Sequence, residues 1–546
     1  MRSGSKTARP EVGQPSFRHL DTAAWQADPM ALTLPPADSL MATTEGRRIL
    51  VSSQLGEASR AQMGQFFTPA SVAEFIASLP LLPTAGVVRI LDPGAGIGSL
   101  TAALVSRIAS ERPGLAMEVT AVELDGALIP ELEETLAGCR RLAAAADCSF
   151  SRRIIQANFL DWAADSVGAL PFDHQPETFD IVVMNPPYRK ISADTTERQA
   201  LQRINVDVSN LYVAFLALSC AILGTEGQIA AITPRSFANG PYFRSFRRYF
   251  FERVVFDRIH MFESRSKVFA GDAVLQENII FSTRRKCSTD HDPEVVITAS
   301  VSADEQVTTR RVPHSQVISP LDPDCFVYIV TDDADAVISE TMARLPTRLP
   351  GLGLEVSTGR VVDFRSREHL RDADESQTVP LLYQGHLKDG GVVWPGTVKK
   401  PTSIVDCADT SKLLLPAETY VLVKRFTAKE ERRRVAASVF EPTDVTTDRV
   451  GLENHLNVFH KGGRGIDATL ARGLAVWLNS TVVDRFFRSF NGHTQVNATD
   501  LRRLPYPSHA ELIAIGDAIG AVRTSDQEKV DALVNAHVGA LRGRRL

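Results

Sequence analysis

Cysteine is scarce in this chain of 546 residues, and its six cysteines include no Cys-x-x-Cys pair. Structural zinc sites and small disulfide-linked domains depend on closely spaced or paired cysteines, so the sequence argues against both. We expect reduced thiols and no bound metal.

Long apolar runs are also absent, and the N-terminus lacks the apolar stretch of a signal peptide. A membrane-spanning helix needs about 20 consecutive apolar residues, so we expect a cytoplasmic protein with no membrane partner. An excess of positive charge is lacking too, because the formal net charge is -5. Any contact with nucleic acid must therefore depend on a local basic patch.

The most informative motif that is present is Asn185-Pro186-Pro187-Tyr188, which follows the strand-forming residues 179–184. Proline lacks a backbone N–H and holds the preceding residue extended, so the strand ends in a stiff loop. Open α/β sheets bind ligands at the carboxyl ends of their strands. The Asn185 amide and a carbonyl freed by the prolines can accept both hydrogens of a planar amino group, and Tyr188 offers an aromatic face. A proline-capped surface turn is the alternative interpretation.

A glycine-rich loop, Asp92-Pro93-Gly94-Ala95-Gly96-Ile97-Gly98, follows the predicted strand at residues 87–91. A strand, a glycine turn and a helix together bring the backbone close to a ligand, although plain connections also use such turns. The next predicted strand, residues 118–122, ends at Glu123, whose carboxylate suits a ribose diol. This spacing indicates a nucleoside cofactor. No Gly-Lys-Ser/Thr follows, so the loop is not a P-loop.

A polar residue and an aromatic one, Asn158-Phe159, come after the third predicted strand, residues 153–156. Such a pair suits the binding of an adenine ring. A phenylalanine packed beneath a loop explains Phe159 equally well.

Two segments rich in arginine are candidates for contact with nucleic acid. Residues 241–253 interleave aromatic residues with arginines, a pattern that favours an amphipathic helix with a basic outer face over a phosphate-binding segment. Residues 424–434 form a dense positive run, which is usually a solvated face but also favours a DNA-binding surface in an acidic protein. The residues of this run that we assign to DNA binding are Lys424, Arg425, Arg432, Arg433 and Arg434.

Alternating strand and helix patterns through residue 283 predict an α/β fold, a Rossmann-like doubly wound sheet with an antiparallel end. The later strands are expected at residues 227–233, 254–259 and 274–281, and one long helix at residues 470–490. The predicted divisions of the chain are a flexible arm at 1–45, a catalytic domain at 46–290, and a mixed α+β domain with C-terminal helices at 310–546.

Taken in order, five motifs resemble one known family. They are Phe66-Phe67-Thr68-Pro69, the loop from Asp92 to Gly98, Glu123, Asn158-Phe159 and Asn185-Pro186-Pro187-Tyr188. This set resembles the gamma group of adenine-N6 DNA methyltransferases of restriction–modification systems, the TaqI-like enzymes. The resemblance covers about residues 46–283, and it continues more loosely through residues 454–458 and 492–504.

The resemblance implies a catalytic methyltransferase domain followed by a DNA target-recognition domain, with S-adenosylmethionine as cofactor. The partners that it implies are double-stranded DNA and a separate cognate restriction endonuclease. Phe67, Thr68, Asp92, Gly94, Gly96, Gly98, Glu123, Asn158 and Phe159 would bind the cofactor. The target amino group would be held by Asn185 and the Pro186 carbonyl, within the Asn185-Pro186-Pro187-Tyr188 loop, and the target base would be flipped out and stacked between Tyr188 and Phe269.

Other functions share this chemistry. A protein glutamine-N5 methyltransferase or an RNA-base methyltransferase also needs acceptors for a planar amino group. A DNA-binding specificity protein with an inactive methyltransferase fold is a third alternative. The large region after the core, with its basic run, favours DNA.

Overall fold

The computed structural model describes residues 39–54, 67–168, 177–192, 195–262, 277–300, 308–372, 375, 377–428, 430–520 and 526–541. The chain divides into two compact units. The first extends to Phe237 and resumes from Tyr242 to Val327, and the second consists of Ala238–Pro241 and the residues from Tyr328 onward. In the described part of the chain, no helix is long and apolar enough to cross a membrane.

The first unit is built on one sheet, which has nine strands among the described residues, in the order β3-β2-β1-β4-β5-β7-β6-β8-β9. Strands β1 to β5 pair in parallel, whereas β7 runs antiparallel to both β5 and β6. The doubly wound sheet with an antiparallel end is therefore confirmed. The strands are β1 (Val87–Pro93), β2 (Ala116–Glu123), β3 (Ser149–Gln156), β4 (Phe179–Met184), β5 (Leu223–Pro234), β6 (Val254–Phe262), β7 (Asn278–Arg285), β8 (Glu294–Ser300) and β9 (Thr308–Pro313).

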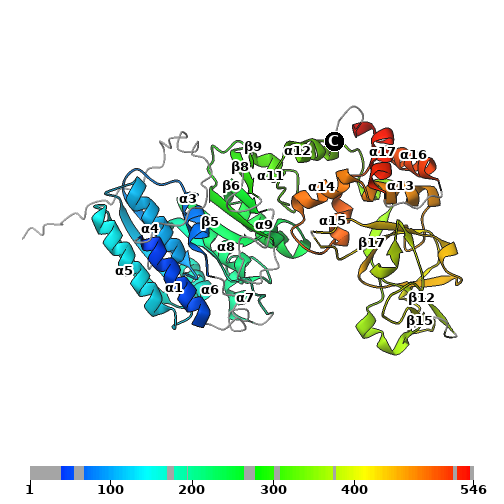
Figure 1. The fold of residues 1–546 in the computed structure, drawn as a ribbon, viewed down its shortest axis with the longest axis horizontal. Helices are drawn as coiled ribbons and strands as arrows, with labels where there is room; N and C mark the ends of the chain where they lie inside the picture. The colour runs from blue at the N-terminus through cyan, green and yellow to red at the C-terminus, as the bar shows by residue number, and fades with distance from the viewer. Residues whose placement is uncertain are drawn as a thin grey trace, which may run out of the picture. The chain divides into compact units, whose positions relative to one another are not determined.

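Helices cover this sheet because its central strands are apolar on both faces. All six residues of β4 are buried, and Ile181 and Val183 join the core formed with the first helices of the unit. Since side chains alternate along a strand, Val182 faces the opposite layer. Figure 1 shows α1, α4 and α5 side by side. The helices are α1 (Leu40–Gln54), α3 (Ala70–Ser78), α4 (Ser99–Glu111), α5 (Ile129–Ala145), α6 (Phe159–Gly168), α7 (Thr196–Gln202), α8 (Leu211–Ala221), α9 (Arg244–Phe251) and α11 (His314–Val317).

The boundaries of the first unit differ from those expected from composition. Helix α1 begins at Leu40, inside the predicted flexible arm, and Glu45 accepts a hydrogen bond from the Ala70 N–H at the start of α3 (3.0 Å). At the other end, β8 and β9 extend the sheet beyond residue 290. Composition marked this region as a linker, yet Val295, Val296 and Ile297 of β8 are buried. The polar strand β9 lies at the edge of the sheet, where a strand needs only one apolar face.

The arginine-rich segment 241–253 also departs from a simple amphipathic helix. Arg247 on α9 is fully buried, and its guanidinium donates to the carbonyl oxygens of Asp324 (2.7 Å) and Phe237 (3.1 Å). The same group lies 4.8 Å from the Phe326 ring centroid. This arginine therefore holds the interior of the first unit together and is not available to DNA.

The second unit combines small sheets with a group of helices. Its described strands form a four-stranded sheet, β10-β20-β17-β18, a five-stranded sheet, β11-β15-β12-β19-β16, and the hairpin β13-β14. The strands are β10 (Glu355–Thr358), β11 (Leu370–Arg371), β12 (Thr378–Leu382), β13 (Leu387–Lys388), β14 (Gly391–Val392), β15 (Ser403–Val405), β16 (Leu414–Pro416), β17 (Tyr420–Lys424), β18 (Ala437–Phe440), β19 (Arg449–Leu452) and β20 (Leu456–His460). The helices are α12 (Asp333–Ala343), α13 (Ala468–Leu478), α14 (Thr481–Phe490), α15 (Ala498–Arg503), α16 (His509–Ile519) and α17 (Gln527–His537).

The single helix predicted at residues 470–490 is wrong, because the structure has two helices, α13 and α14. The Asn479 amide bonds both the N–H (2.9 Å) and the C=O (2.8 Å) of Ala437, and the Ser480 hydroxyl caps α14 by accepting from the Val483 N–H. Asn and Ser side chains that bond the backbone in this way favour helix ends over helix interiors.

The close packing of α13 on α16 depends on two glycines and gives a first testable prediction (Figure 1). A methyl group on Gly473 would overlap the Leu512 carbonyl oxygen, and one on Gly516 would overlap the Thr469 carbonyl oxygen. We expect Gly473→Ala to lower the free energy of unfolding by about 1–3 kcal/mol, measured by denaturant titration.

Gly46→Ala is the matched control for this substitution. Gly46 also lies inside a helix, α1, but a methyl group there would meet no atom within 4 Å. Because alanine favours a helix by up to about 1 kcal/mol over glycine, the control should be neutral or stabilising. An equal effect of both substitutions would contradict the packing argument.

Candidate active site

A cavity of about 700 Å³ lies at the carboxyl edge of the parallel strands in the first unit. Of the residues predicted from sequence, those that line it are Phe67, Gly94, Gly96, Glu123, Asn158, Phe159, Asn185 and Pro187. These residues come from four separate strand ends and from the segment before α3. The parallel order of β1 to β4 brings them together, as expected for an open α/β sheet.

The glycine loop after β1 is shaped to leave room in this cavity. Gly94 and Gly96 have positive φ angles, 71° and 56°, which favour glycine. A Cβ on Gly94 would lie 3.3 Å from the Phe215 ring, and one on Gly96 would lie 3.4 Å from the Phe67 ring. Larger residues at these two positions would therefore fill the space that a ligand needs.

Two other residues of the same loop support the loop and do not line the cavity. The Asp92 carboxylate is buried and accepts a hydrogen bond from the Thr101 hydroxyl on α4 (2.7 Å), and burial raises the pKa of Asp92 to about 7. Gly98 precedes α4 with a φ of 86°, and a Cβ there would lie 2.9 Å from the Leu132 side chain. Both residues join the loop to its helices.

Glu123 connects the glycine loop to the end of β2. Its Oε2 atom accepts from the Gly96 N–H (2.7 Å), and its Oε1 atom accepts from the Asp125 N–H (2.8 Å). Burial raises the pKa of this carboxyl, while these backbone hydrogen bonds lower it. Each carboxylate oxygen retains acceptor capacity for a further hydrogen bond. The two backbone hydrogen bonds thus fix the orientation of the Glu123 carboxylate, which lines the cavity.

Asn158 and Phe159 lie at the start of α6, beside the cavity. The Asn158 Oδ1 atom accepts from the Leu160 N–H (3.0 Å), which fixes the amide at the helix terminus. The Phe159 ring is buried, with its centroid 4.8 Å from that of Phe215 on α8. The ring therefore packs beneath the loop and also lines the cavity.

The Asn185-Pro186-Pro187-Tyr188 loop holds its asparagine at two points. The Asn185 Nδ2 atom donates to the Thr68 hydroxyl (3.0 Å), and the Tyr188 hydroxyl donates to Asn185 Oδ1 (3.0 Å). Because Thr68 occupies the amino end of the amide, the carbonyl oxygen is directed to the Tyr188 side. Thr68, expected only to contact the cofactor, therefore also orients the predicted catalytic asparagine.

The Tyr188 ring is held edge-on against Tyr212, with their centroids 6.2 Å apart. The Tyr212 hydroxyl is in turn 2.7 Å from the Ser236 hydroxyl, in the short turn that follows β5. Burial raises the pKa of the Tyr188 phenol, so it remains a neutral donor. Phe269, predicted to stack on the other side of a target base, lies outside the described residues.

Sequence reasoning missed several residues that line the cavity. Arg189 directly follows the loop and forms an ion pair with Glu197 on α7 (2.9 Å). Leu211 and Phe215 reach the cavity from α8, whose apolar sequence predicts a buried helix but not which side faces a ligand. The remaining missed lining residues are Val122, Leu124, Asp125, Leu128 and Ala157.

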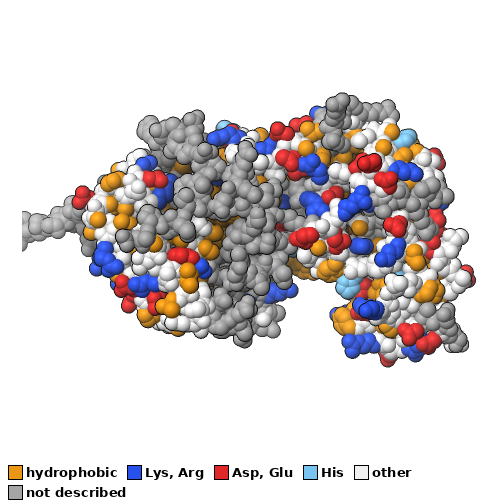
Figure 2. All heavy atoms as spheres, viewed as in Figure 1, with side chains coloured by type: hydrophobic (Ala, Val, Ile, Leu, Met, Phe, Trp, Pro, Cys, Tyr) orange, Lys and Arg blue, Asp and Glu red, His pale blue; other side chains and the backbone are white. Residues whose placement is uncertain are grey.

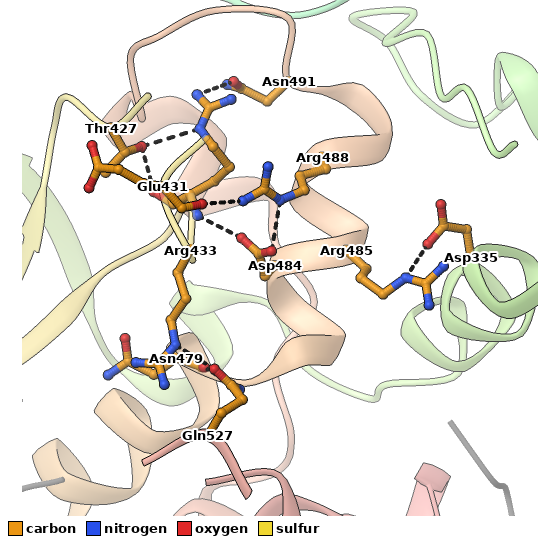
Figure 3. A network of polar contacts seen from close by, with 11 residues as sticks. Asp335, Thr427, Glu431, Arg433, Asn479, Asp484, Arg485, Arg488, Asn491 and Gln527 are labelled. Atoms are coloured by element: carbon orange, nitrogen blue, oxygen red, sulfur yellow. Dashed lines mark hydrogen bonds and ion pairs between the residues drawn. The ribbon is translucent and has the colours of Figure 1, made fainter. Parts of the chain in front are cut away.

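Part of the basic run in the second unit is structural, which corrects the prediction that Arg434 binds DNA. This arginine is buried, and its guanidinium donates to Thr427 (3.2 Å) and to Asn491 (2.9 Å), while its N–H donates to Asp484 (2.6 Å). Arg433 donates to Gln527 on α17 (2.7 Å). Figure 3 shows Thr427, Glu431 and Arg433 inside a network that includes residues of α14. In the second unit, Figure 2 shows the acidic and basic side chains of the described residues intermixed over the visible face.

The cavity fits the expected cofactor, S-adenosylmethionine. Its volume suits a small-molecule site, since such sites measure roughly 300–1,000 Å³. Two glycines leave space where a Cβ would intrude, and a carboxylate suited to a ribose diol projects from β2. Phe67, Phe159 and Phe215 supply apolar walls for a flat ring.

Comparison with known proteins gives the family. Residues 130–269 match the Eco57I restriction-modification methylase family. The chain is 39% identical over 498 residues to the type II methyltransferase M.PstI of Providencia stuartii, covering 91% of this chain and 97% of that protein. It is also 39% identical over 501 residues to the type II methyltransferase M.BsuBI of Bacillus subtilis, covering 90% of this chain and 97% of that protein.

A solved structure extends the likeness of fold to both units. The type IIL restriction-modification enzyme MmeI aligns with a TM-score of 0.50 and 10% identity, covering 92% of this chain and 76% of that one. This likeness concerns the fold alone. The family is given by the two relatives that the chain matches over nearly their full length. The chain belongs to the type II DNA methyltransferases of restriction–modification systems, whose methyl donor is S-adenosylmethionine.

Proposed function

We propose that this methyltransferase modifies the N6 amino group of adenine within a specific sequence of double-stranded DNA. The observation that carries the proposal is the Asn185 amide, which borders the cavity and is anchored through its Nδ2 atom to Thr68 (3.0 Å). Its Oδ1 atom accepts from the Tyr188 hydroxyl (3.0 Å) and has a second acceptor site for an exocyclic amino group.

The contributions of the chain's own residues follow from this geometry. Bound S-adenosylmethionine supplies a methyl group on a positively charged sulfur. Asn185 Oδ1 and the Pro186 carbonyl accept the two N–H groups of the target amine and stabilise the positive charge that develops on its nitrogen. An amino group inside a duplex cannot reach the cavity, so the base must leave the stack. The Tyr188 ring offsets part of that cost by stacking, worth about 1–3 kcal/mol.

The alternative substrates are less well supported. The likeness to M.PstI and M.BsuBI spans 97% of each relative and therefore includes the second unit. A glutamine-N5 or RNA-base methyltransferase that shares only the catalytic core has no need of such a unit. We place the protein in the cytoplasm with the DNA, as the modification enzyme that protects sites from a separate cognate endonuclease.

The test incubates purified protein and isotopically labelled S-adenosylmethionine, in separate reactions, with genomic DNA, with RNA and with a glutamine-containing peptide, followed by digestion and mass spectrometry. N6-methyladenine is the expected product. A label found in N4-methylcytosine, or in RNA or a glutamine-containing peptide but not in DNA, would contradict the proposal. A duplex in which the target adenine is replaced by a purine without an amino group is the control and should accept no label.

A further inference from the structure

Three loops of the second unit that are distant in sequence meet at one place. They contribute Arg425-Phe426 after β17, Asn454-His455 between β19 and β20, and Thr494-Gln495 after α14. The Arg425 N–H donates to the His455 carbonyl (2.9 Å), and the backbones of Phe426 and Gln495 form a β-bridge. Two of these loops carry the segments whose resemblance to the family extends beyond the catalytic domain.

The middle loop is a tight turn that displays a histidine. The Leu456 N–H donates to the Glu453 carbonyl (3.0 Å), so Asn454 and His455 form the corner of the turn. The Glu453 side chain is fully buried, yet it lies directly beneath an imidazole that is 39% exposed. Glu453 Oε1 is 2.6 Å from His455 Nδ1, and Glu453 Oε2 accepts from the His455 N–H (2.9 Å).

This arrangement determines which ring nitrogen faces outward. The carboxylate accepts a hydrogen from Nδ1, so the imidazole is fixed in orientation and Nε2 is the nitrogen that it presents. A histidine that served only to hold the turn would not need to expose its ring. A buried carboxylate needs such hydrogen-bond partners, so Glu453 holds the imidazole in a fixed orientation while the ring remains 39% exposed.

The surroundings of the imidazole suit DNA. The Phe426 ring centroid lies 4.9 Å from the imidazole, and the Arg425 guanidinium lies 5.9 Å from the Phe426 ring. Arg425 also donates to the Asn454 carbonyl (3.1 Å), which ties it to the turn. A cation beside an oriented hydrogen-bonding ring combines a group suited to phosphate with a group suited to a base edge.

We propose that His455 hydrogen-bonds a base edge of the DNA recognition sequence through Nε2, with Glu453 as its positioning residue and Arg425 on a neighbouring phosphate. This inference rests on sequence-specific DNA methylation by the protein. It does not depend on which base receives the methyl group. Of the basic run, it assigns only Arg425 to the DNA surface.

The test begins with the wild-type recognition sequence, read by sequencing methylated DNA from expressing cells. The variants His455→Ala and Glu453→Gln are then assayed on the cognate duplex and on a set of duplexes that each carry one altered base pair. For His455→Ala we expect kcat/KM on the cognate duplex to fall by about tenfold and discrimination at one position to disappear. Glu453→Gln should show a smaller loss at the same position.

Two controls separate this role from a general defect. The Kd for S-adenosylmethionine of His455→Ala should match that of the wild type, and its melting temperature reports the stability lost when the buried Glu453 carboxylate loses this partner. His509→Ala, which removes an exposed histidine at the start of α16, should keep full discrimination. Unchanged discrimination in His455→Ala, or an equal loss at every position, would overturn the proposal. If the wild-type enzyme produces methylcytosine, that result refutes the proposed adenine specificity, and the test of His455 remains valid.

Discussion

Asn185→Ala is expected to lower the rate of methyl transfer to DNA by about 10²–10³-fold, the loss typical of removing one preorganised group that stabilises developing charge. The substitution removes the Oδ1 acceptor at the cavity and the Nδ2 contact to the Thr68 hydroxyl. It leaves the glycine loop and Glu123 unchanged, so the Kd for S-adenosylmethionine should remain within about twofold of the wild-type value. Single-turnover transfer of a labelled methyl group and calorimetric titration of the cofactor measure the two quantities.

Gln199→Ala provides a matched control, because it removes an exposed amide from α7 in the same unit. It should change neither the rate of methyl transfer nor the Kd for S-adenosylmethionine. Thr68→Val removes only the hydroxyl that accepts from Asn185 Nδ2. Its transfer rate should lie between those of the wild type and Asn185→Ala. Retention of the full rate by Asn185→Ala would show that the amide does not contact the target amine.

Glu123→Ala is expected to raise the Kd for S-adenosylmethionine by about 100-fold. Two charge-assisted hydrogen bonds to a ribose diol contribute about 1.5 kcal/mol each, and both are lost. The substitution also frees the Gly96 and Asp125 N–H groups, which Glu123 holds at 2.7 and 2.8 Å. Calorimetric titration of the purified protein with cofactor gives the Kd, and a thermal melt reports any loss of folded structure.

The corresponding control is Glu133→Ala, which removes an exposed carboxylate on α5 and should leave the Kd unchanged. Transfer measured at saturating cofactor should recover most of the wild-type rate in Glu123→Ala, because Asn185 is intact. A wild-type Kd in a well-folded Glu123→Ala protein would exclude the ribose contact.

The cavity was predictable because local motifs report local geometry. Asn185 is followed by two prolines, Pro186 and Pro187, which keep the chain extended up to Tyr188. The positive φ angles of Gly94 and Gly96 favour glycine. Motif position does not distinguish a residue that lines the cavity from one that supports it. Asp92 and Gly98 belong to the same loop, yet contacts with α4 and α5 give them structural roles.

The basic run shows why the DNA-binding residues of the second unit could not be predicted from the sequence. Whether an arginine is solvated or buried depends on partners far along the chain, such as Asn491 for Arg434. Charge patterns report composition and carry no information about these partners. For the same reason, the arrangement around His455 could not be predicted. Its buried carboxylate partner and its aromatic neighbour are brought together only in the folded second unit.

The division of the chain has a practical consequence for making fragments. The second unit includes the tetrapeptide Ala238–Pro241, which the chain reaches before it completes the first unit. Within that tetrapeptide, the Asn239 side chain donates to the buried carboxylate of Asp500 (3.4 Å). A recombinant piece that starts at Tyr328 would lose this donor, and exchange of specificity regions between relatives by one crossover would transfer an incomplete unit. Chimeras should therefore be built with two junctions.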